Sequence, residues 1–217
     1  MKYSAVLFDL DGTLVDTLED LGDSMNAALS AHGYPIHPIA AYKYFVGDGV
    51  ENLVRRALPA DAARNEETVR KVVPVMRAEY AHRWKDKTHP YPGVPEMLDA
   101  LRERGVKLTV LSNKPHPATL EVVENFFSNW HFDAVFGARP EVPIKPDAGA
   151  ALEVSRATGV PPDHFLYLGD TNTDMLTARA AGMFAVGALW GFRTAQELSE
   201  AGAAVLAAHP MDILKLL

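Results

Sequence analysis

The sequence contains no cysteine. That absence excludes disulfide bonds, thiolate metal sites and cysteine nucleophiles, and it fits a reducing compartment. Long apolar runs are missing too, since no stretch approaches the roughly 18 residues that a membrane-spanning helix needs. At the N-terminus a lone Lys precedes a short apolar stretch that runs directly into acids, which is not the pattern of a signal peptide. We therefore expect a cytoplasmic protein with no membrane partner.

Positive charge is scarce as well. The 217 residues include 21 Lys and Arg against 28 Asp and Glu, which gives a formal net charge of −7. Nucleic-acid binding needs a basic face, so this balance argues against a nucleic acid as a partner. A small phosphorylated ligand is compatible with it, because a local cation can outweigh the net charge.

Short apolar runs alternate with helical patterns along most of the chain. Strands are expected over 3–8, 106–111, 134–136, 165–168, 183–186 and 203–206. Helices are expected between them, over 97–104, 117–127, 148–158 and 174–181. Strands that alternate with helices form a parallel sheet covered on both faces. The sequence therefore predicts an α/β fold with a three-layer, Rossmann-like core.

A helical block interrupts this alternation directly after the first strand. Apolar residues recur at helical spacing over 18–31, 50–58 and 69–84, and Pro74 is expected to bend or interrupt the last of these helices. We interpret residues 17–87 as an inserted all-helical cap on a core made of residues 1–16 and 88–217. The crossings near residues 16–18 and 88–91 are candidate hinges.

Polar clusters follow the strands where an open parallel sheet binds ligands, beyond its carboxyl ends. They are "DLDGT" at 9–13, "SNK" at 112–114, "IKP" at 144–146 and "GDTNTD" at 169–174. Several acids at one place are stable only when protons or a metal ion compensate them. Mg²⁺ suits such a place, because it prefers oxygen ligands and is usually held by one or two carboxylates with a substrate phosphate. Asp9 and Asp170 would supply the carboxylates and Asp11 its backbone carbonyl.

The same clusters can carry phosphoryl transfer. Asp9, at the strand end, fits a nucleophile that forms an aspartyl-phosphate. Asp11, two residues on, fits the acid that protonates the leaving alkoxide and the base that later activates water. Ser112 and Asn113 would hydrogen-bond the phosphoryl oxygens, and Lys145 would neutralise their charge.

Taken together, "DLDGTLVDT", "LSNK", "IKPD" and "LGDTNTD" resemble the four motifs of the haloacid dehalogenase superfamily, in the same order. Within it, "VGDGVENLVRRAL", "SNKP", "YLGDTNTDMLTARAAG" and "WGFR" are similar to phosphoglycolate phosphatases. The resemblance covers the whole chain. It implies the same site residues: Asp9 as nucleophile, Asp11 as acid/base, Ser112 and Lys145 as phosphate ligands, Asp170 as metal ligand, and Asp174 supporting the metal shell or orienting Lys145. "KPDAGAAL" lacks an expected proline and "LEDLGDSMNAAL" has an acidic start, and both departures leave the substrate open.

Each cluster also has a purely structural interpretation. Asp9 and Asp11 could form an Asx turn, and Asp170 and Asp174 could be acids at a helix N-terminus. Lys145 could be an exposed loop lysine. The pair at 112–113 could cap the following helix, which is compatible with phosphate binding there. The match is specific as a set, and any single member of it is not.

Three further residues are candidates for substrate binding. Thr13 belongs to the first cluster. Gly47, in "GDG" at 47–49, lies in a loop whose glycines permit close backbone approach, which suits a specificity loop. Arg55, or its neighbour Arg56, could bind a substrate carboxylate when the cap closes, because guanidinium matches carboxylate bidentately. Arginines on a helix more often form a solvated face.

The sequence thus predicts a Mg²⁺-dependent phosphomonoester hydrolase that acts on a small phosphorylated metabolite through an aspartyl-phosphate, as a monomer or homodimer. The favoured substrate is 2-phosphoglycolate. A sugar-phosphate phosphatase or phosphomutase, a pyrophosphatase and a nucleotidase of the same fold remain alternatives. A dehalogenase has no use for an acid at Asp11, and a non-catalytic binding module would require a lost motif residue, whereas none is lost.

Overall fold

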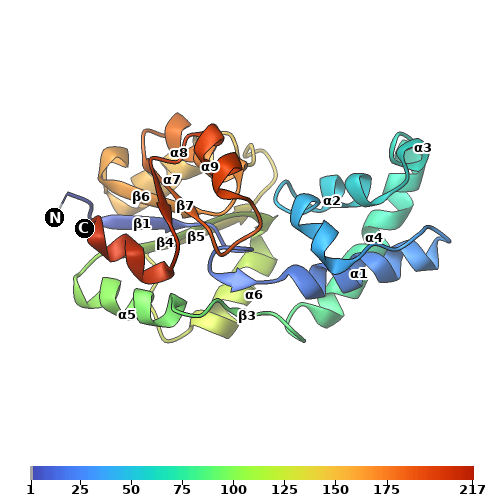
Figure 1. Cartoon of the computed structure of the whole chain (residues 1–217), viewed down its shortest axis with the longest axis horizontal. Helices are drawn as coiled ribbons and strands as arrows, with labels where there is room; N and C mark the ends of the chain where they lie inside the picture. Colours follow the sequence, from blue (N-terminus) through green and yellow to red (C-terminus); the bar gives the residue numbers. More distant parts are fainter. Residues whose placement is uncertain (1) are drawn as a thin grey trace. The chain divides into compact units, whose positions relative to one another are not determined.

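The computed structural model describes residues 2–217, and these divide into two compact units. One unit contains Pro90–Leu217 together with the chain up to Val15, and the other is Asp16–His89 (Figure 1). The chain crosses between the units at two short strands, β2 (Val15–Asp16) and β3 (His89–Pro90), which pair with each other. The sequence placed the insertion at residues 17–87.

Within the described residues, the first unit is built on a six-stranded sheet with the order β5-β4-β1-β6-β7-β8. All neighbouring strands are parallel. The strands are β1 (Ala5–Phe8), β4 (Lys107–Pro115), β5 (Ala134–Ala138), β6 (Phe165–Gly169), β7 (Phe184–Ala188) and β8 (Val205–Ala207). Every residue of β1 and β6 is buried, as expected for strands covered on both faces.

Helices cover both faces of this sheet (Figure 1). On one face lie α5 (Val94–Glu103) and α6 (His116–Phe127); on the other lie α7 (Gly149–Thr158), α8 (Asn172–Ala180) and α9 (Ala195–Ala201). Two 3-10 helices, η2 (Pro162–His164) and η3 (Pro210–Lys215), complete the described elements of this unit. The predicted α/β fold class is confirmed.

A continuous apolar core supports the central strands. Leu7 of β1 and Tyr167 of β6 are register partners, and both are fully buried against Val154 of α7 and Met175 of α8. Complete burial of an apolar side chain contributes about 1.5–3 kcal/mol, so this packing fixes the ends of β1 and β6 firmly. The residues that follow these two ends are Asp9 and Asp170.

The second unit is helical apart from its strand ends. It contains α1 (Leu18–Ala31), η1 (Ile39–Tyr44), α2 (Val50–Ala57), α3 (Ala60–Ala63) and α4 (Glu66–Arg83). Met25, Leu29, Tyr42 and Val54 are fully buried in it. The Tyr42 hydroxyl donates to Asn26 Oδ1 at 2.7 Å, which satisfies the polar end of this buried ring.

Helix α4 corrects part of one expectation: it continues through Pro74, so the proline does not interrupt it. The side chain of Asn65 caps its first turn by accepting from the backbone N–H groups of Glu67 and Thr68. A proline inside a helix costs about 3 kcal/mol. Burial of Val72 and Met76, on either side of Pro74, offsets a cost of that size.

Strand β4 corrects a second expectation. It extends through Lys114 to Pro115, with a register shift against β5 between Leu111 and Pro115. The helix that follows, α6, begins at His116 with Pro115 at its N-cap and no side-chain cap. Ser112 and Asn113 therefore do not cap that helix, and the capping interpretation is wrong.

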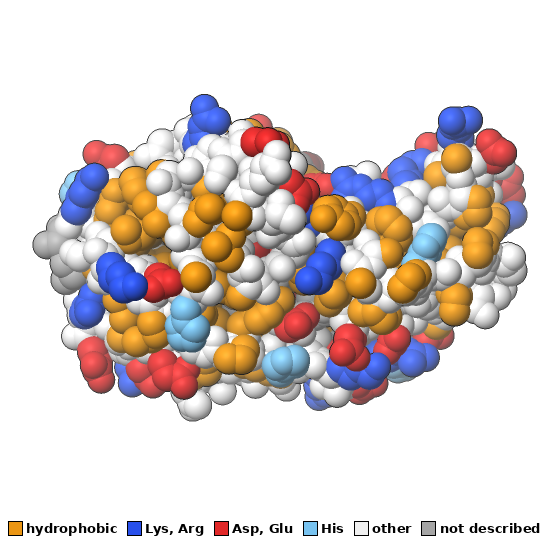
Figure 2. Space-filling view, in the orientation of Figure 1, with side chains coloured by type: hydrophobic (Ala, Val, Ile, Leu, Met, Phe, Trp, Pro, Cys, Tyr) orange, Lys and Arg blue, Asp and Glu red, His pale blue; other side chains and the backbone are white. Residues whose placement is uncertain are grey.

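On the face shown in Figure 2, Lys and Arg side chains lie among Asp and Glu side chains. Among residues 2–217, none of the helices combines the length and apolar character that a membrane span requires.

Candidate active site

The sheet order brings three of the four polar clusters to one edge. β1 lies between β4 and β6, so Asp9 follows the central strand, Ser112 lies in its neighbour β4, and Asp170 follows its other neighbour β6. The backbone N–H of Asp9 donates to the carbonyl of Leu168 at 2.9 Å, which extends the pairing of β1 with β6 to Asp9. Carboxyl ends of parallel strands are where such sheets bind ligands.

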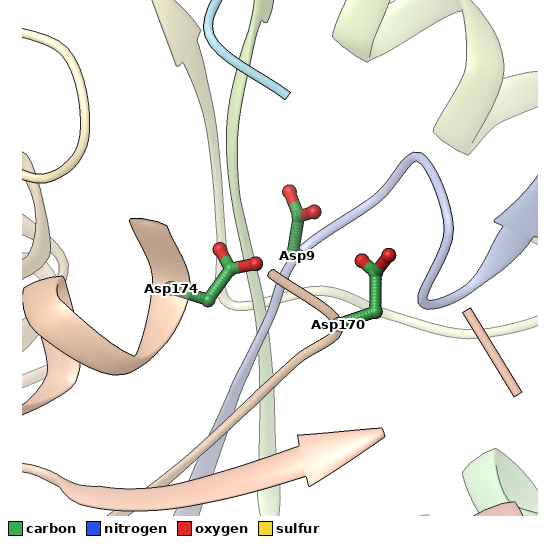
Figure 3. A group of neighbouring side chains, drawn as sticks. All are labelled: Asp9, Asp170 and Asp174. Atoms are coloured by element: carbon green, nitrogen blue, oxygen red, sulfur yellow. The ribbon is translucent and has the colours of Figure 1, made fainter. Parts of the chain in front are cut away.

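Three carboxylates converge at this edge. Asp9, Asp170 and Asp174 are buried, and one oxygen of each lies within 4.8 Å of the others (Figure 3). Asp9 comes from the end of β1, Asp170 from the end of β6 and Asp174 from the first turn of α8. Buried acids this close to one another repel, so the arrangement needs cations.

Lys145 supplies a cation to this group. Its Nζ lies 2.7 Å from Asp9 Oδ1 and 2.7 Å from Asp174 Oδ1, and the residue is only 3% exposed. The side chain of Asn113 fixes the main chain of Lys145, since Asn113 Oδ1 accepts from the Lys145 N–H at 2.9 Å and Asn113 Nδ2 donates to its carbonyl at 3.1 Å. Lys145 is therefore not an exposed loop lysine. The structure gives Asn113 a positioning contact that the sequence did not indicate.

The pKa values show that Lys145 compensates the negative charge of the three carboxylates only in part. Burial raises the pKa of Asp9 well above its ordinary range, Asp174 and Asp170 add to the shift, and Lys145 opposes it. Burial and the charge of Asp174 raise the pKa of Asp170 to about 7. Burial alone would lower the pKa of Lys145, but Asp174 and Asp9 outweigh it and hold that pKa above its usual range.

Asp170 is held by two donors. The Thr13 hydroxyl donates to Oδ1 at 2.9 Å, and the backbone N–H of Phe192 donates to Oδ2 at 2.8 Å. Gly12, at φ +93°, lies against this carboxylate, where an added Cβ would collide with it. A glycine is required there for both backbone conformation and space.

Asp174 carries both of the roles considered from the sequence. It is the third residue of α8 and forms a capping box with Thr171, accepting from the Thr171 N–H at 3.1 Å and hydroxyl at 2.7 Å. Its other oxygen accepts from Lys145. Asp174 is therefore an acid at a helix N-terminus and, at the same time, a partner that orients Lys145.

Asp11 lies apart from this cluster and has a partner that the sequence did not suggest. Lys114 Nζ lies 2.9 Å from Asp11 Oδ1 and 3.0 Å from Oδ2, and the two side chains are 5% and 15% exposed. Lys114 belongs to "SNK", directly after two residues that we singled out. Its place in this candidate cluster was the signal in the sequence that pointed to Lys114.

The remaining predicted residues fall into two groups. The Ser112 hydroxyl is buried and accepts from the Lys114 N–H at 3.1 Å. Gly47 and Arg55 belong to the helical unit, where Gly47 has φ +121° and the Arg55 guanidinium binds Glu51 and Glu66. Substrate contacts by these residues remain predictions.

Comparison with known proteins decides the family. The model of the haloacid dehalogenase-like hydrolases matches residues 6–188. The chain belongs to this family. The resemblance stated from the sequence is confirmed, and so is the expectation of an enzyme.

Relatives of this haloacid dehalogenase-like hydrolase agree with that assignment. Phosphoglycolate phosphatase 1 of Pseudomonas aeruginosa is 32% identical over 213 residues, 96% of this chain and 78% of the relative. The phosphoglycolate phosphatase of Psychrobacter arcticus is 31% identical over 207 residues, 92% of this chain and 89% of the relative. A solved structure from Lactobacillus delbrueckii subsp. bulgaricus, 32% identical, has a TM-score of 0.93 over 100% of this chain and 98% of that one. A predicted phosphoglycolate phosphatase from Haemophilus somnus, 27% identical, has a TM-score of 0.91 over 100% and 98%.

The donor set of this hydrolase fits a hard divalent cation. Asp9, Asp170 and Asp174 offer only oxygen atoms, which Mg²⁺ prefers. Lys145 brings a single positive charge to the three carboxylates. The raised pKa values of Asp9 and Asp170 show a shortfall of positive charge at the site. A bound cation at these oxygens would remove it.

Proposed function

We propose that this protein is a Mg²⁺-dependent phosphomonoesterase that uses Asp9 as its nucleophile and 2-phosphoglycolate as its preferred substrate. One observation carries the proposal. A buried carboxylate at the end of the central strand lies 2.7 Å from a buried lysine and close to two further carboxylates, with the ion-paired Asp11 two residues away. A structural acid has no need of such surroundings.

Mg²⁺, held by Asp9, Asp170 and the backbone carbonyl of Asp11, with Asp174 supporting them, would offset the repulsion between the attacking carboxylate and the phosphoryl oxygens. Lys145 keeps Asp9 oriented and places a positive charge beside the transferring group. Asn113 keeps Lys145 in place through both of its hydrogen bonds to the lysine main chain.

The reaction then proceeds in two displacements. An oxygen of Asp9 bonds to phosphorus while the bond from phosphorus to the leaving oxygen breaks, and Asp11 donates a proton to that oxygen. Asp11 next takes a proton from water, which attacks the phosphorus of the aspartyl-phosphate. The bond between Asp9 and phosphorus breaks, and inorganic phosphate leaves.

The choice of substrate rests on the relatives. The two phosphoglycolate phosphatases compared above are at least 31% identical and align over more than nine tenths of this chain. A carboxylate-bearing substrate also agrees with the expectation that Arg55 binds such a group. We therefore expect 2-phosphoglycolate to be hydrolysed with the highest kcat/KM in a panel that includes sugar phosphates, nucleotides and pyrophosphate.

Phosphate release with and without Mg²⁺ tests the proposal, with Asp9→Asn as the decisive variant. The wild-type enzyme should need the cation, and Asp9→Asn should lose turnover while keeping its far-UV circular dichroism spectrum. Turnover by Asp9→Asn near the wild-type rate would refute the nucleophile. A panel in which another phosphate ester is preferred would refute only the substrate.

A further inference from the structure

The segment "WGFR" at 190–193, between β7 and α9, has no role in the chemistry described so far. The structure brings its first three residues against the first polar cluster and the metal-ligand candidate Asp170. The indole N–H of Trp190 donates to the carbonyl of Thr13 at 2.9 Å. The N–H of Phe192 donates to Asp170 Oδ2 at 2.8 Å.

Gly191, between these two donors, is packed too closely for any other residue. A Cβ at this position would collide with Asp170 Cβ and with the carbonyl oxygen of Gly12. The backbone of the segment thus lies directly on the side chain of Asp170 and on the loop that follows Asp9. Trp190 adds a hydrogen bond to the loop, and Phe192 adds one to Asp170.

We propose that Trp190, Gly191 and Phe192 act as positioning residues that hold Asp170 and the 9–13 loop in the arrangement that binds the divalent cation; this rests on the proposed metal-dependent function. Thr13 links the two halves of the contact, since its carbonyl accepts from Trp190 while its hydroxyl donates to Asp170 Oδ1 at 2.9 Å. Hydrogen bonds to a metal-binding carboxylate fix its orientation before the ion arrives, and their loss weakens metal binding.

Cation binding measured directly provides the test. Free Mn²⁺ gives an electron paramagnetic resonance signal, so titration of the protein with Mn²⁺ yields a Kd without any turnover. Trp190→Phe keeps an aromatic ring but removes the indole N–H. Replacement of Trp190 by benzothienylalanine, which has sulfur in place of that N–H, keeps the size of the ring as well.

Trp130→Phe is the matched control. The indole N–H of Trp130 donates to Asp99 Oδ1 at 3.1 Å. Both residues belong to the same unit as Trp190, with Asp99 in α5 and Trp130 after the end of α6. We expect both replacements of Trp190 to raise the Kd for Mn²⁺ about 3- to 10-fold, the effect of one lost hydrogen bond. Trp130→Phe should leave the Kd unchanged even where it lowers the melting temperature.

The outcomes separate this inference from the proposed function. Wild-type Kd values in both Trp190 replacements would overturn the inference and leave the function standing. An effect in Trp190→Phe alone would also overturn it, because ring packing and not the hydrogen bond would then be responsible. Equal weakening by Trp130→Phe would overturn it as a non-specific effect. Failure of the wild-type protein to bind Mn²⁺ at one site would overturn both.

Discussion

Two ion-paired groups, one in each unit, place the same kinds of charged side chain in opposite surroundings. In the sheet unit, Lys145 is buried and lies between the buried Asp9 and Asp174. In the helical unit, Arg55 pairs with Glu51 and Glu66, whose side chains are 64% and 61% exposed. Charges in water need no partner, and exposed ion pairs contribute little. Buried charges depend on one another, so that removal of one leaves the others uncompensated.

The local sequence does not reveal this difference in either unit. A lysine before proline, or an arginine in a helix, looks the same whether it is buried or exposed. The lysine belongs to the site because it is buried between two carboxylates. The comparison predicts that equivalent substitutions in the two units will have very different consequences.

The largest effect is expected from Lys145→Met. It removes the ammonium from Asp9 and Asp174 and takes a positive charge from the transferring phosphoryl group, so kcat/KM for 2-phosphoglycolate should fall at least about 10³-fold. Steady-state phosphate release measures it, with circular dichroism to verify folding. A fall of less than tenfold in a folded variant would show that this buried charge is dispensable.

The next effect concerns pH in the absence of divalent cations. The pKa of Asp170 is about 7 in the folded protein, above its ordinary value of 3.8. The folded state therefore binds more protons than the unfolded state between these pH values, and stability falls as pH rises towards 7. We expect the melting temperature of the metal-free protein to drop by roughly 5 °C or more between pH 5 and pH 8.

Mg²⁺ should remove most of this loss, because the cation stabilises the ionised carboxylates at the higher pH. Asp170→Asn provides the matched control: it should reduce the pH dependence of the metal-free protein, and the raised pKa of Asp9 should account for the part that remains. Differential scanning calorimetry at both pH values measures the effect. A metal-free protein that gains stability over this range would contradict the picture of uncompensated buried acids.

Lys114→Met should have a smaller effect that depends on the leaving group. Lys114 binds both oxygens of Asp11, so its loss frees the carboxylate to turn away from the leaving oxygen. We expect kcat/KM, which reports the first displacement, to fall about tenfold on 2-phosphoglycolate, whose alkoxide needs a proton, and much less on p-nitrophenyl phosphate, whose phenolate does not. Equal losses on both substrates would show that Lys114 does not act through Asp11.

The general architecture could be predicted because it depends on local patterns. Alternating apolar runs and helical periods gave the α/β class, and the positions of polar residues after strands gave most members of the site. Asp9 and Asp170 lie close together because the sheet order places β1 and β6 side by side. Lys145, in the segment between β5 and α7, contacts Asp9. A single cluster does not reveal the sheet order.

The features that the sequence did not predict depend on contacts between residues that are distant in the sequence. Nothing near Lys114 indicates that it meets Asp11, 103 positions away. The indole of Trp190 meets Thr13 across 177 positions. Polarity suggested a loop at 112–114, whereas neighbouring strands draw this stretch into β4. Pro74 suggested a bend or a break, and the helix is not broken there. In these last two stretches tertiary packing overrides the local preference.

The smallest effect is expected from Arg55→Met, the counterpart of Lys145→Met in the helical unit, where the arginine side chain is 27% exposed. Its partners are solvent-exposed glutamates, so the melting temperature should change by no more than about 2 °C. The same variant tests the predicted contact with a substrate carboxylate, which would raise KM for 2-phosphoglycolate and leave KM for p-nitrophenyl phosphate unchanged. If the variant changes KM by the same factor for both substrates, or leaves both unchanged, Arg55 does not bind the substrate carboxylate. A much larger drop in melting temperature would contradict the contrast between the two networks, because an ion pair in water costs less to break than a buried one.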